Sequence, residues 1–170
     1  TLALALVLVV ADIGYGLVRL RAAAAVGTSV VDDARIRIVQ PNINQGQKWS
    51  NDFRQATITK LIELSDAKTG PDAMGAMSFN QIIWPETALP FFLTEEPSAL
   101  EAIAELLPPG TSLVAGAPRL EPTDTGRRFY NSVFVIDDAG GIVAAYDKIH
   151  LVPFGEYMPM QGLLDRLGIG

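Results

Sequence analysis

A carboxylate that directly follows an apolar run is the first candidate for chemistry. Residues 81–84 have strand character and end at Pro85, which cannot continue a sheet ladder, and Glu86 comes next. In open α/β sheets, ligands bind where strands end and loops begin. Apolar surroundings formed by Trp84 and Leu89 would raise the pKa of Glu86 and suit it to act as a general base. A solvated loop glutamate is the alternative, and the Trp-Pro-Glu sequence by itself favours it.

A lysine and a histidine follow the last expected strand, residues 142–146. Lys148 could stabilise a developing oxyanion or pair with a carboxylate, or it could be a salt-bridged surface residue. The loop that follows is apolar and holds three turn-forming residues between positions 153 and 159, which is unusual for a simple connection. We expect His150 to be a structural histidine.

A third cluster lies near the first expected strand. The sequence Val-Gln-Pro-Asn-Ile at 39–43 is followed by Lys48 and Trp49. The proline ends a strand, and the asparagine side chain can hydrogen-bond to nearby backbone. Trp49 could line a pocket or pack in the core.

Composition excludes several classes of protein. The 170 residues contain no Cys, so neither a disulfide framework nor a thiol nucleophile is present in them, and one His rules out a His-rich metal site. The formal net charge of −6 argues against a broad nucleic-acid surface. The sequence also lacks the serine elbow, the P-loop, the dinucleotide fingerprint and the zinc-protease helix.

The order of expected elements predicts an α/β domain. Apolar runs and periodicity indicate strands at 35–40, 81–84 and 112–117, helices at 52–68 and 98–107, a polar loop at 118–128, and a hairpin of strands 130–136 and 142–146. Strands that alternate with helices favour a mainly parallel sheet with helices against it.

The first residues differ from the rest of the chain. Residues 1–31 hold only three charges, Asp12, Arg19 and Arg21. A bilayer span needs about 20 mostly apolar residues, and the uninterrupted run here is residues 2–11. We expect residues 1–21 to be the end of a transmembrane helix, followed by a linker at 22–34. A secretory signal peptide and a buried core helix are the alternatives.

Taken together, these motifs resemble the nitrilase superfamily of carbon-nitrogen hydrolases. Members share a Glu–Lys–Cys triad on an α-β-β-α sandwich. Glu86 matches the family glutamate, and Tyr-Asp-Lys-Ile-His-Leu at 146–151 matches the lysine motif. The branch of apolipoprotein N-acyltransferases is indicated by Val-Pro-Phe-Gly-Glu-Tyr-Met-Pro at 152–159, by 39–43 with Lys48 and Trp49, by 84–90, and by Tyr-Asn-Ser at 130–132.

The resemblance implies roles for individual residues. Glu86 would be the general base and Lys148 the cation that supports the oxyanion. Glu156 matches a further site carboxylate, and Trp49 matches a position tied to the substrate pocket. No cofactor or metal is implied. Residues 35–170 would be the N-terminal part of the catalytic domain, a partial sandwich in a C-terminally truncated fragment. In the family the nucleophilic Cys lies tens of residues beyond the lysine, so we expect this fragment to be inactive alone.

The resemblance also implies partners and a location. The full enzyme would move an acyl chain from a phospholipid onto a cysteine thiol, and then onto the N-terminal diacylglyceryl-cysteine of an apolipoprotein. It would sit in the bacterial inner membrane, with its catalytic domain on the periplasmic side. A soluble nitrilase-type amidase and a non-catalytic domain of the same fold are the alternatives.

Overall fold

The structure is a computed structural model that describes residues 2–26, 31–44, 46, 51–70, 74–124 and 126–159. It divides into two units, Thr1–Asp33 and Ala34–Gly170.

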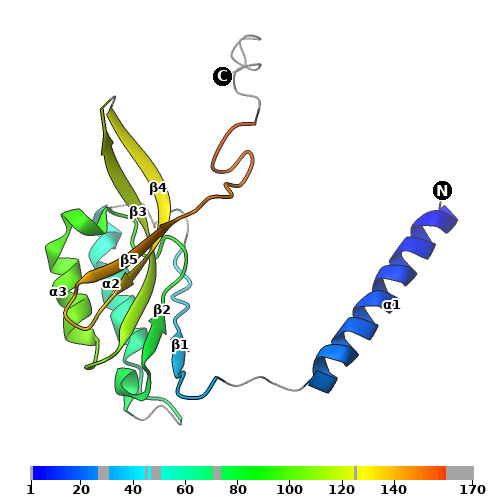
Figure 1. Cartoon of the computed structure of the whole chain (residues 1–170), viewed down its shortest axis with the longest axis horizontal. Helices are drawn as coiled ribbons and strands as arrows, with labels where there is room; N and C mark the ends of the chain where they lie inside the picture. Colours follow the sequence, from blue (N-terminus) through cyan, green and yellow to red (C-terminus); the bar gives the residue numbers. More distant parts are fainter. Residues whose placement is uncertain are drawn as a thin grey trace. The chain divides into compact units, whose positions relative to one another are not determined.

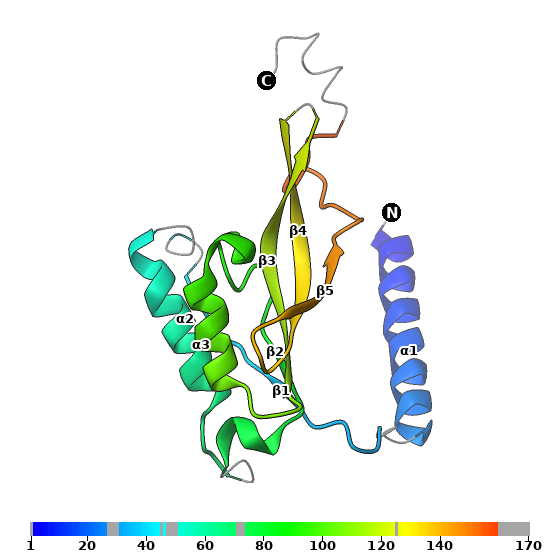
Figure 2. The same cartoon turned by 60° about the vertical axis from the view of Figure 1, so that its left-hand side comes forward.

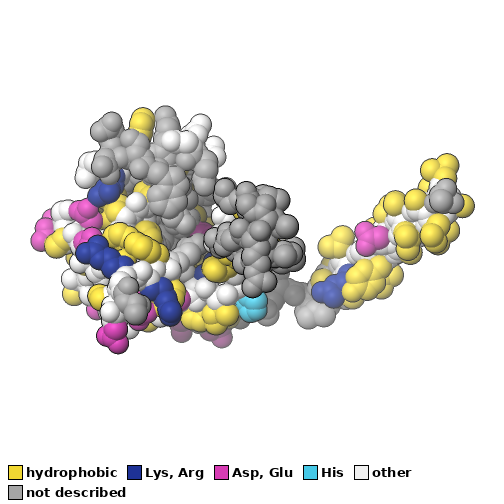
Figure 3. All heavy atoms as spheres, turned by 90° about the horizontal axis from the view of Figure 1, so that it is seen from above, with side chains coloured by type: hydrophobic (Ala, Val, Ile, Leu, Met, Phe, Trp, Pro, Cys, Tyr) yellow, Lys and Arg dark blue, Asp and Glu magenta, His cyan; other side chains and the backbone are white. Residues whose placement is uncertain are grey.

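The first unit is a single apolar helix, α1 (Leu2–Val26). At 1.5 Å per residue its length is about 37 Å, enough to cross the roughly 30 Å hydrocarbon core of a bilayer. The stretch Leu2–Ala24 has a mean hydropathy of 2.0, and hydrophobic side chains cover most of its visible surface (Figure 3). No described residue of this helix is buried within its own unit. A signal sequence would share these properties. The helix continues past the expected end at residue 21 because residues 22–25 are all alanine, the best helix former.

The second unit is a five-stranded sheet with helices on one face (Figures 1 and 2). In sheet order its strands are β1 (Ile36–Ile38), β2 (Gln81–Ile83), β3 (Ser112–Thr123), β4 (Gly126–Ile136) and β5 (Ile142–Asp147). Its helices are α2 (Asn51–Ser65) and α3 (Pro97–Leu106), with short 3-10 turns η1 (Gly75–Ser78) and η2 (Leu93–Glu95). The α/β class is confirmed.

The sheet is mixed, where we expected it to be mainly parallel. The β1–β2 and β2–β3 pairs are parallel, whereas the β3–β4 and β4–β5 pairs are antiparallel. Short turns join β3, β4 and β5, and a parallel pair requires a crossover of a dozen or more residues. The connection lengths therefore force the second half of the sheet to be antiparallel.

Residues 118–128 are not the polar loop that we expected. Strands β3 and β4 remain paired from Pro118 opposite Asn131 to Thr123 opposite Gly126. Polar side chains bond across the two strands there, since the Tyr130 hydroxyl donates to Glu121 Oε2 at 2.6 Å. The hydrophobic pattern disappears at this end because cross-strand polar pairs replace core packing, while the backbone pairing continues.

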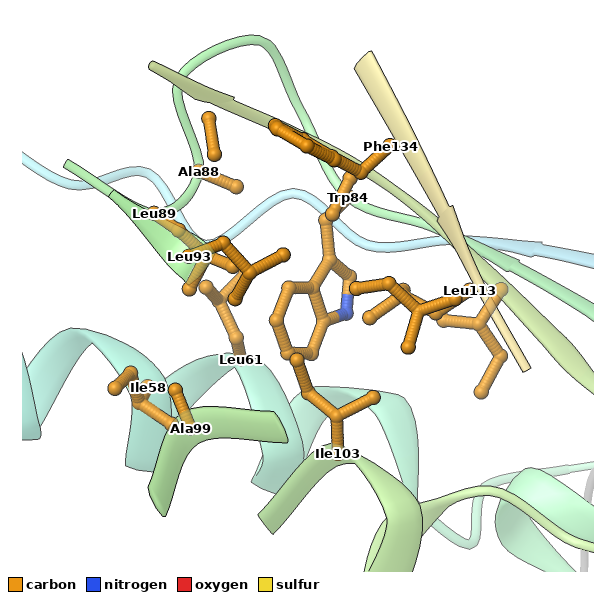
Figure 4. Packing of buried hydrophobic residues seen from close by; sticks show 14 of the residues in the cluster. Ile58, Leu61, Trp84, Ala88, Leu89, Leu93, Ala99, Ile103, Leu113 and Phe134 are labelled. Atoms are coloured by element: carbon orange, nitrogen blue, oxygen red, sulfur yellow. The ribbon is translucent and has the colours of Figure 1, made fainter. Parts of the chain in front are cut away.

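The core lies between the sheet and helices α2 and α3 (Figure 4). Trp84 is 3% exposed, and its indole ring lies among Leu61, Ile103 and Leu113. Its Nε1–H donates to Ser65 Oγ at 2.8 Å, so the one polar atom of the ring is satisfied. The buried apolar residues are Val39, Ile58, Leu61, Ala76, Ile82, Trp84, Ala88, Leu89, Phe91, Leu93, Ala99, Ile103, Leu107, Leu113, Ala115, Ala117, Phe134 and Ile136.

Alternation along β4 assigns its side chains to two faces. Ser132, Phe134 and Ile136 are buried on the core side. Successive strand residues point to opposite faces, so Asn131 and Val133 face away from the helices. We call that face the outer face of the sheet; Val133 is 42% exposed on it.

Candidate functional site

Glu86 lies on the stretch of chain that crosses β3 directly after β2. Pro85 accepts a hydrogen bond at its carbonyl from the Gly116 N–H at 3.3 Å, and the Leu89 N–H donates to the Gly116 carbonyl at 3.1 Å. A Cβ atom on Gly116 would lie 2.5 Å from the Thr87 nitrogen and 2.8 Å from the Glu86 Cα. Only glycine therefore permits the crossing.

The crossing also holds Thr87 in an unusual backbone conformation. Its φ of 49° lies in the left-handed region, which is rare for a β-branched residue. Strain of this kind persists where the surrounding structure imposes it, and it clusters at functional sites. The residue directly after Glu86 is therefore held in place by its neighbours in spite of its own preference.

Replacing Gly116 by Ala is expected to displace Glu86. The new methyl group would overlap the backbone of residues 86 and 87, and overpacking of this kind costs about 1–3 kcal/mol of unfolding free energy. NMR titration of the side-chain carboxyl should show the pKa of Glu86 rising toward its ordinary value as the carboxylate leaves its partners. Gly14→Ala is the matched control, since a Cβ there meets nothing within 4 Å. An unchanged Glu86 titration in Gly116→Ala would show that the crossing does not position the carboxylate.

Lys148 arrives at the same edge of the sheet from β5. Two antiparallel steps separate β3 from β5, so β5 runs in the same direction as β2 and both strands end at one edge. The Lys148 Nζ lies 3.0 Å from Glu86 Oε1 and 2.9 Å from Glu156 Oε1. Glu86 and Lys148 therefore meet, although 62 positions separate them in the sequence.

Asn131 completes the cluster from β4. Its Nδ2 donates to Glu86 Oε1 at 2.6 Å and to Glu156 Oε1 at 3.2 Å. Its backbone carbonyl accepts from the Lys148 N–H at 2.8 Å. In the sequence, Asn131 belongs to the Tyr-Asn-Ser motif at 130–132, and that motif by itself indicates no role for the residue. We call Glu86, Asn131, Lys148 and Glu156 the carboxylate–lysine cluster.

The loop after β5 is built around Glu156. The Val152 N–H donates to Glu156 Oε2 at 2.8 Å, and the Phe154 N–H donates to the Tyr157 carbonyl at 2.7 Å. Phe154 has a φ of 64°. The tight turn leaves one Glu156 oxygen for the backbone and the other for Lys148 and Asn131.

The electrostatics of the cluster correct one expectation. The hydrogen bond from Lys148, and then that from Asn131, holds the pKa of Glu86 below its ordinary value, where we expected an apolar environment to raise it. Trp84 and Leu89 are 3% and 0% exposed in the core, whereas the Glu86 side chain is 61% exposed. The apolar neighbours in sequence therefore turn away from the carboxylate, and a cation takes their place.

The pKa values of Glu156 and Lys148 also shift in the directions that favour the charged forms. Hydrogen bonds from Lys148 and from the Val152 N–H lower the pKa of Glu156. Hydrogen bonds to Glu156 and then to Glu86 raise the pKa of Lys148. All three groups are thus held in their charged forms, with one ammonium between two carboxylates.

Two pockets meet at Glu86. One of about 300 Å³ is lined by Glu86, Asn131 and Lys148 together with apolar residues of the outer face, among them Val114 and Val133. The other, of about 360 Å³, is lined by residues 38–43 and by the turn that carries Glu86. A ligand in either pocket would have apolar walls and the Glu86 carboxylate at one end.

Three residues singled out from the sequence are not part of the geometry described so far. Lys48 and Trp49 lie outside the described residues, so the pocket role of Trp49 stays a prediction. His150, which we expected to be structural, is exposed.

The family profile for carbon-nitrogen hydrolases matches residues 35–167, which is most of the second unit and includes the whole cluster. The chain belongs to the carbon-nitrogen hydrolase family. The resemblance noted from the Glu86 and Lys148 motifs is therefore confirmed. Among solved structures, an amidase from Nesterenkonia sp. is 16% identical, with a TM-score of 0.49, covering 76% of this chain and 48% of that one.

Relatives within the carbon-nitrogen hydrolases match at higher identity. The chain is 43% identical over 169 residues to the apolipoprotein N-acyltransferase of Rhodopseudomonas palustris, which covers 98% of this chain and 31% of the relative. It is 44% identical over 144 residues to that of Bradyrhizobium diazoefficiens, covering 83% and 27% respectively. The resemblance to this branch is confirmed, and the chain spans less than a third of the length of these relatives.

Proposed function

We propose that the protein containing these residues is an apolipoprotein N-acyltransferase. It takes an acyl chain from a phospholipid and passes it to the α-amino group of the diacylglyceryl-cysteine at the N-terminus of an apolipoprotein. The observation that carries the proposal is the contact of the Lys148 Nζ with both Glu86 and Glu156 at one sheet edge. The identity to N-acyltransferases supports the choice of reaction within the family.

The first half of the proposed reaction forms a thioester. Glu86, held ionised by Lys148, accepts the proton of a cysteine thiol, and the sulfur attacks the ester carbonyl of the phospholipid. The ammonium of Lys148 offsets the negative charge that develops on the carbonyl oxygen. The carbon–oxygen bond to the lysophospholipid then breaks, and Glu86 returns the proton to the leaving oxygen.

The second half transfers the acyl chain to nitrogen. The free α-amino group of the lipoprotein attacks the thioester carbonyl, a carbon–nitrogen bond forms and the carbon–sulfur bond breaks. Glu86 accepts a proton from the amine and delivers it to the sulfur. Lys148 again faces the oxyanion.

Glu156 and Trp49 have supporting roles in the proposal. When Glu86 is protonated it loses its charge, and Glu156 still accepts a hydrogen bond from Lys148 at 2.9 Å. The ammonium therefore keeps its place through the cycle. Trp49 is proposed as a wall of the substrate pocket on its match to the family position.

A membrane location suits two lipid substrates. We propose that α1 is the end of a transmembrane helix, that the residues between α1 and position 34 form a linker, and that 35–170 belong to a catalytic domain on the periplasmic side of the bacterial inner membrane. Helix α1, long and apolar enough to cross a bilayer, supports this arrangement.

The 170-residue chain alone is expected to show no acyl transfer. It contains no Cys, and a thioester mechanism requires a thiol; we propose that the thiol is supplied by a part of the protein beyond these residues. The test incubates the purified chain in detergent with phospholipid and a diacylglyceryl-cysteine peptide, and measures N-acylated peptide by mass spectrometry. Product above a control without protein would contradict both the triad and the proposed source of the thiol.

The complete gene product, assayed in the same way, tests the function itself. N-acylated peptide is the expected result. Hydrolysis of small amides without acyl transfer would instead favour the amidase alternative, and no reaction of either kind would favour the non-catalytic one.

A further inference from the structure

A second polar network lies on the core side of the strands that carry the carboxylate–lysine cluster. Arg119 on β3 donates from Nε to Asp147 Oδ1 at 2.8 Å and from Nη2 to Asp147 Oδ2 at 2.7 Å. Ser132 on β4 donates from Oγ to Asp147 Oδ1 at 2.6 Å. We call Arg119, Ser132 and Asp147 the core-side network. Paired N–H···O bonds between a guanidinium and a carboxylate are strong and fix the geometry of both groups.

The network is held in place at its arginine end. The Arg119 guanidinium carbon lies 4.5 Å from the centroid of the Tyr130 ring, and Arg119 and Tyr130 are partners in the β3–β4 register. The Arg119 side chain therefore reaches Asp147 by passing across β4. The hydrogen bonds from Arg119 also lower the pKa of Asp147, so the pair stays charged at neutral pH.

The core-side network and the carboxylate–lysine cluster lie one residue apart on two strands. Ser132 and Asp147 are register partners, and the residues beside them are Asn131 and Lys148. Since strand side chains alternate between faces, an Asp147 that points to the core side requires Lys148 to point to the outer face. A slip of one residue would exchange the two.

The side chains of β5 are little buried. Residues 143–146 are exposed, and only the two terminal residues of the strand, Ile142 and Asp147, are partly buried. Ile142 packs against the core at the far end. At the end that delivers Lys148, the β4–β5 ladder reaches Ser132 opposite Asp147 and continues with the Lys148 N–H, which donates to the Asn131 carbonyl at 2.8 Å. The Asp147 side-chain bonds add an attachment on the core side.

We propose that Arg119, Ser132 and Asp147 are positioning residues that aim Lys148 at Glu86 and Glu156. They act through the register and face of β5. The inference rests on the proposed function in one respect only, namely that this function makes Lys148 a catalytic residue. It is tested without turnover, so the two ideas can fail separately.

The test uses Asp147→Asn and Arg119→Met in the full chain, in detergent micelles, by NMR. In both variants the Lys148 amide should exchange with solvent about tenfold faster, since a hydrogen-bonded charged pair has been lost. The carboxyl titrations of Glu86 and Glu156 should both move toward their ordinary pKa values, because Lys148 spends less time between them. Arg119→Lys, which keeps the charge but not the paired geometry, should fall between these variants and the wild type.

Glu96→Gln is the matched control. It breaks a different ion pair, in which Arg54 Nη1 lies 2.6 Å from Glu96 Oε1 on the helix side of the sheet, and it should leave both titrations unchanged. If Asp147→Asn lowers the melting temperature while Glu86 and Glu156 titrate as in the wild type, Asp147 is only structural and the proposal is wrong. If the titrations move but loss of Lys148 leaves the complete enzyme active, the positioning role stands and the proposed function fails.

Discussion

Glu86→Gln in the complete enzyme should lower acyl transfer by about 10²–10⁴-fold, the usual contribution of a positioned general base. The amide keeps the shape of the carboxylate but cannot accept the thiol proton. The site should survive the change, because Glu156 still accepts a hydrogen bond from Lys148 and Asn131 still donates to Glu156. Rates of thioester formation and of N-acylation, measured separately, should both fall.

Glu101→Gln provides the comparison for that variant. Glu101 is an exposed residue of α3, and its substitution should leave both rates unchanged. Normal thioester formation in Glu86→Gln would mean that another group removes the thiol proton, and the role of Glu86 would then be limited to holding Lys148.

Lys148→Arg should lower turnover by about 10²–10³-fold, the loss typical of removing one oxyanion donor. The ammonium sits between two carboxylate oxygens at 3.0 and 2.9 Å. A guanidinium is longer and planar, and it pairs with carboxylates through a fork, so it will not direct a single compact charge at the oxyanion. The loss should appear in kcat more than in KM, because the oxyanion exists only in the transition state.

Lys60→Arg is the control for charge-preserving substitution. Lys60 is exposed on α2, and turnover should be unaffected there. Turnover near the wild-type rate in Lys148→Arg would indicate that any cation at this position suffices, and that Lys148 is a structural partner of the two glutamates.

Much of the site could be predicted from short stretches of sequence. Pro85 ends β2, and this places Glu86 just past a strand, as the position of a proline within an apolar run indicates. Lys148 likewise follows the last strand of the expected hairpin. These features depend on local pattern, on alternation and on turn-forming residues, all of which can be read within a few positions.

The ionisation of Glu86 could not be predicted in this way. Its neighbours in sequence, Trp84 and Leu89, suggested an apolar setting, yet the groups that determine its pKa are Lys148 and Asn131. A pKa responds to charges and donors within a few ångströms, whichever part of the chain supplies them. Only the tertiary structure brings a residue 62 positions away to 3.0 Å.

The difference between local pattern and distant partners also explains which other predictions from the sequence could be made. Local patterns in the chain were enough to predict the residues that could act as base and cation, the α/β class, and a first helix apolar enough to cross a bilayer. They could not predict that the chain crosses β3 at Gly116, or that Asp147 faces Arg119 while Lys148 faces Glu86. Local periodicity sets how a strand alternates, whereas the face that each side chain finally takes depends on which distant partner it can bond or pack against.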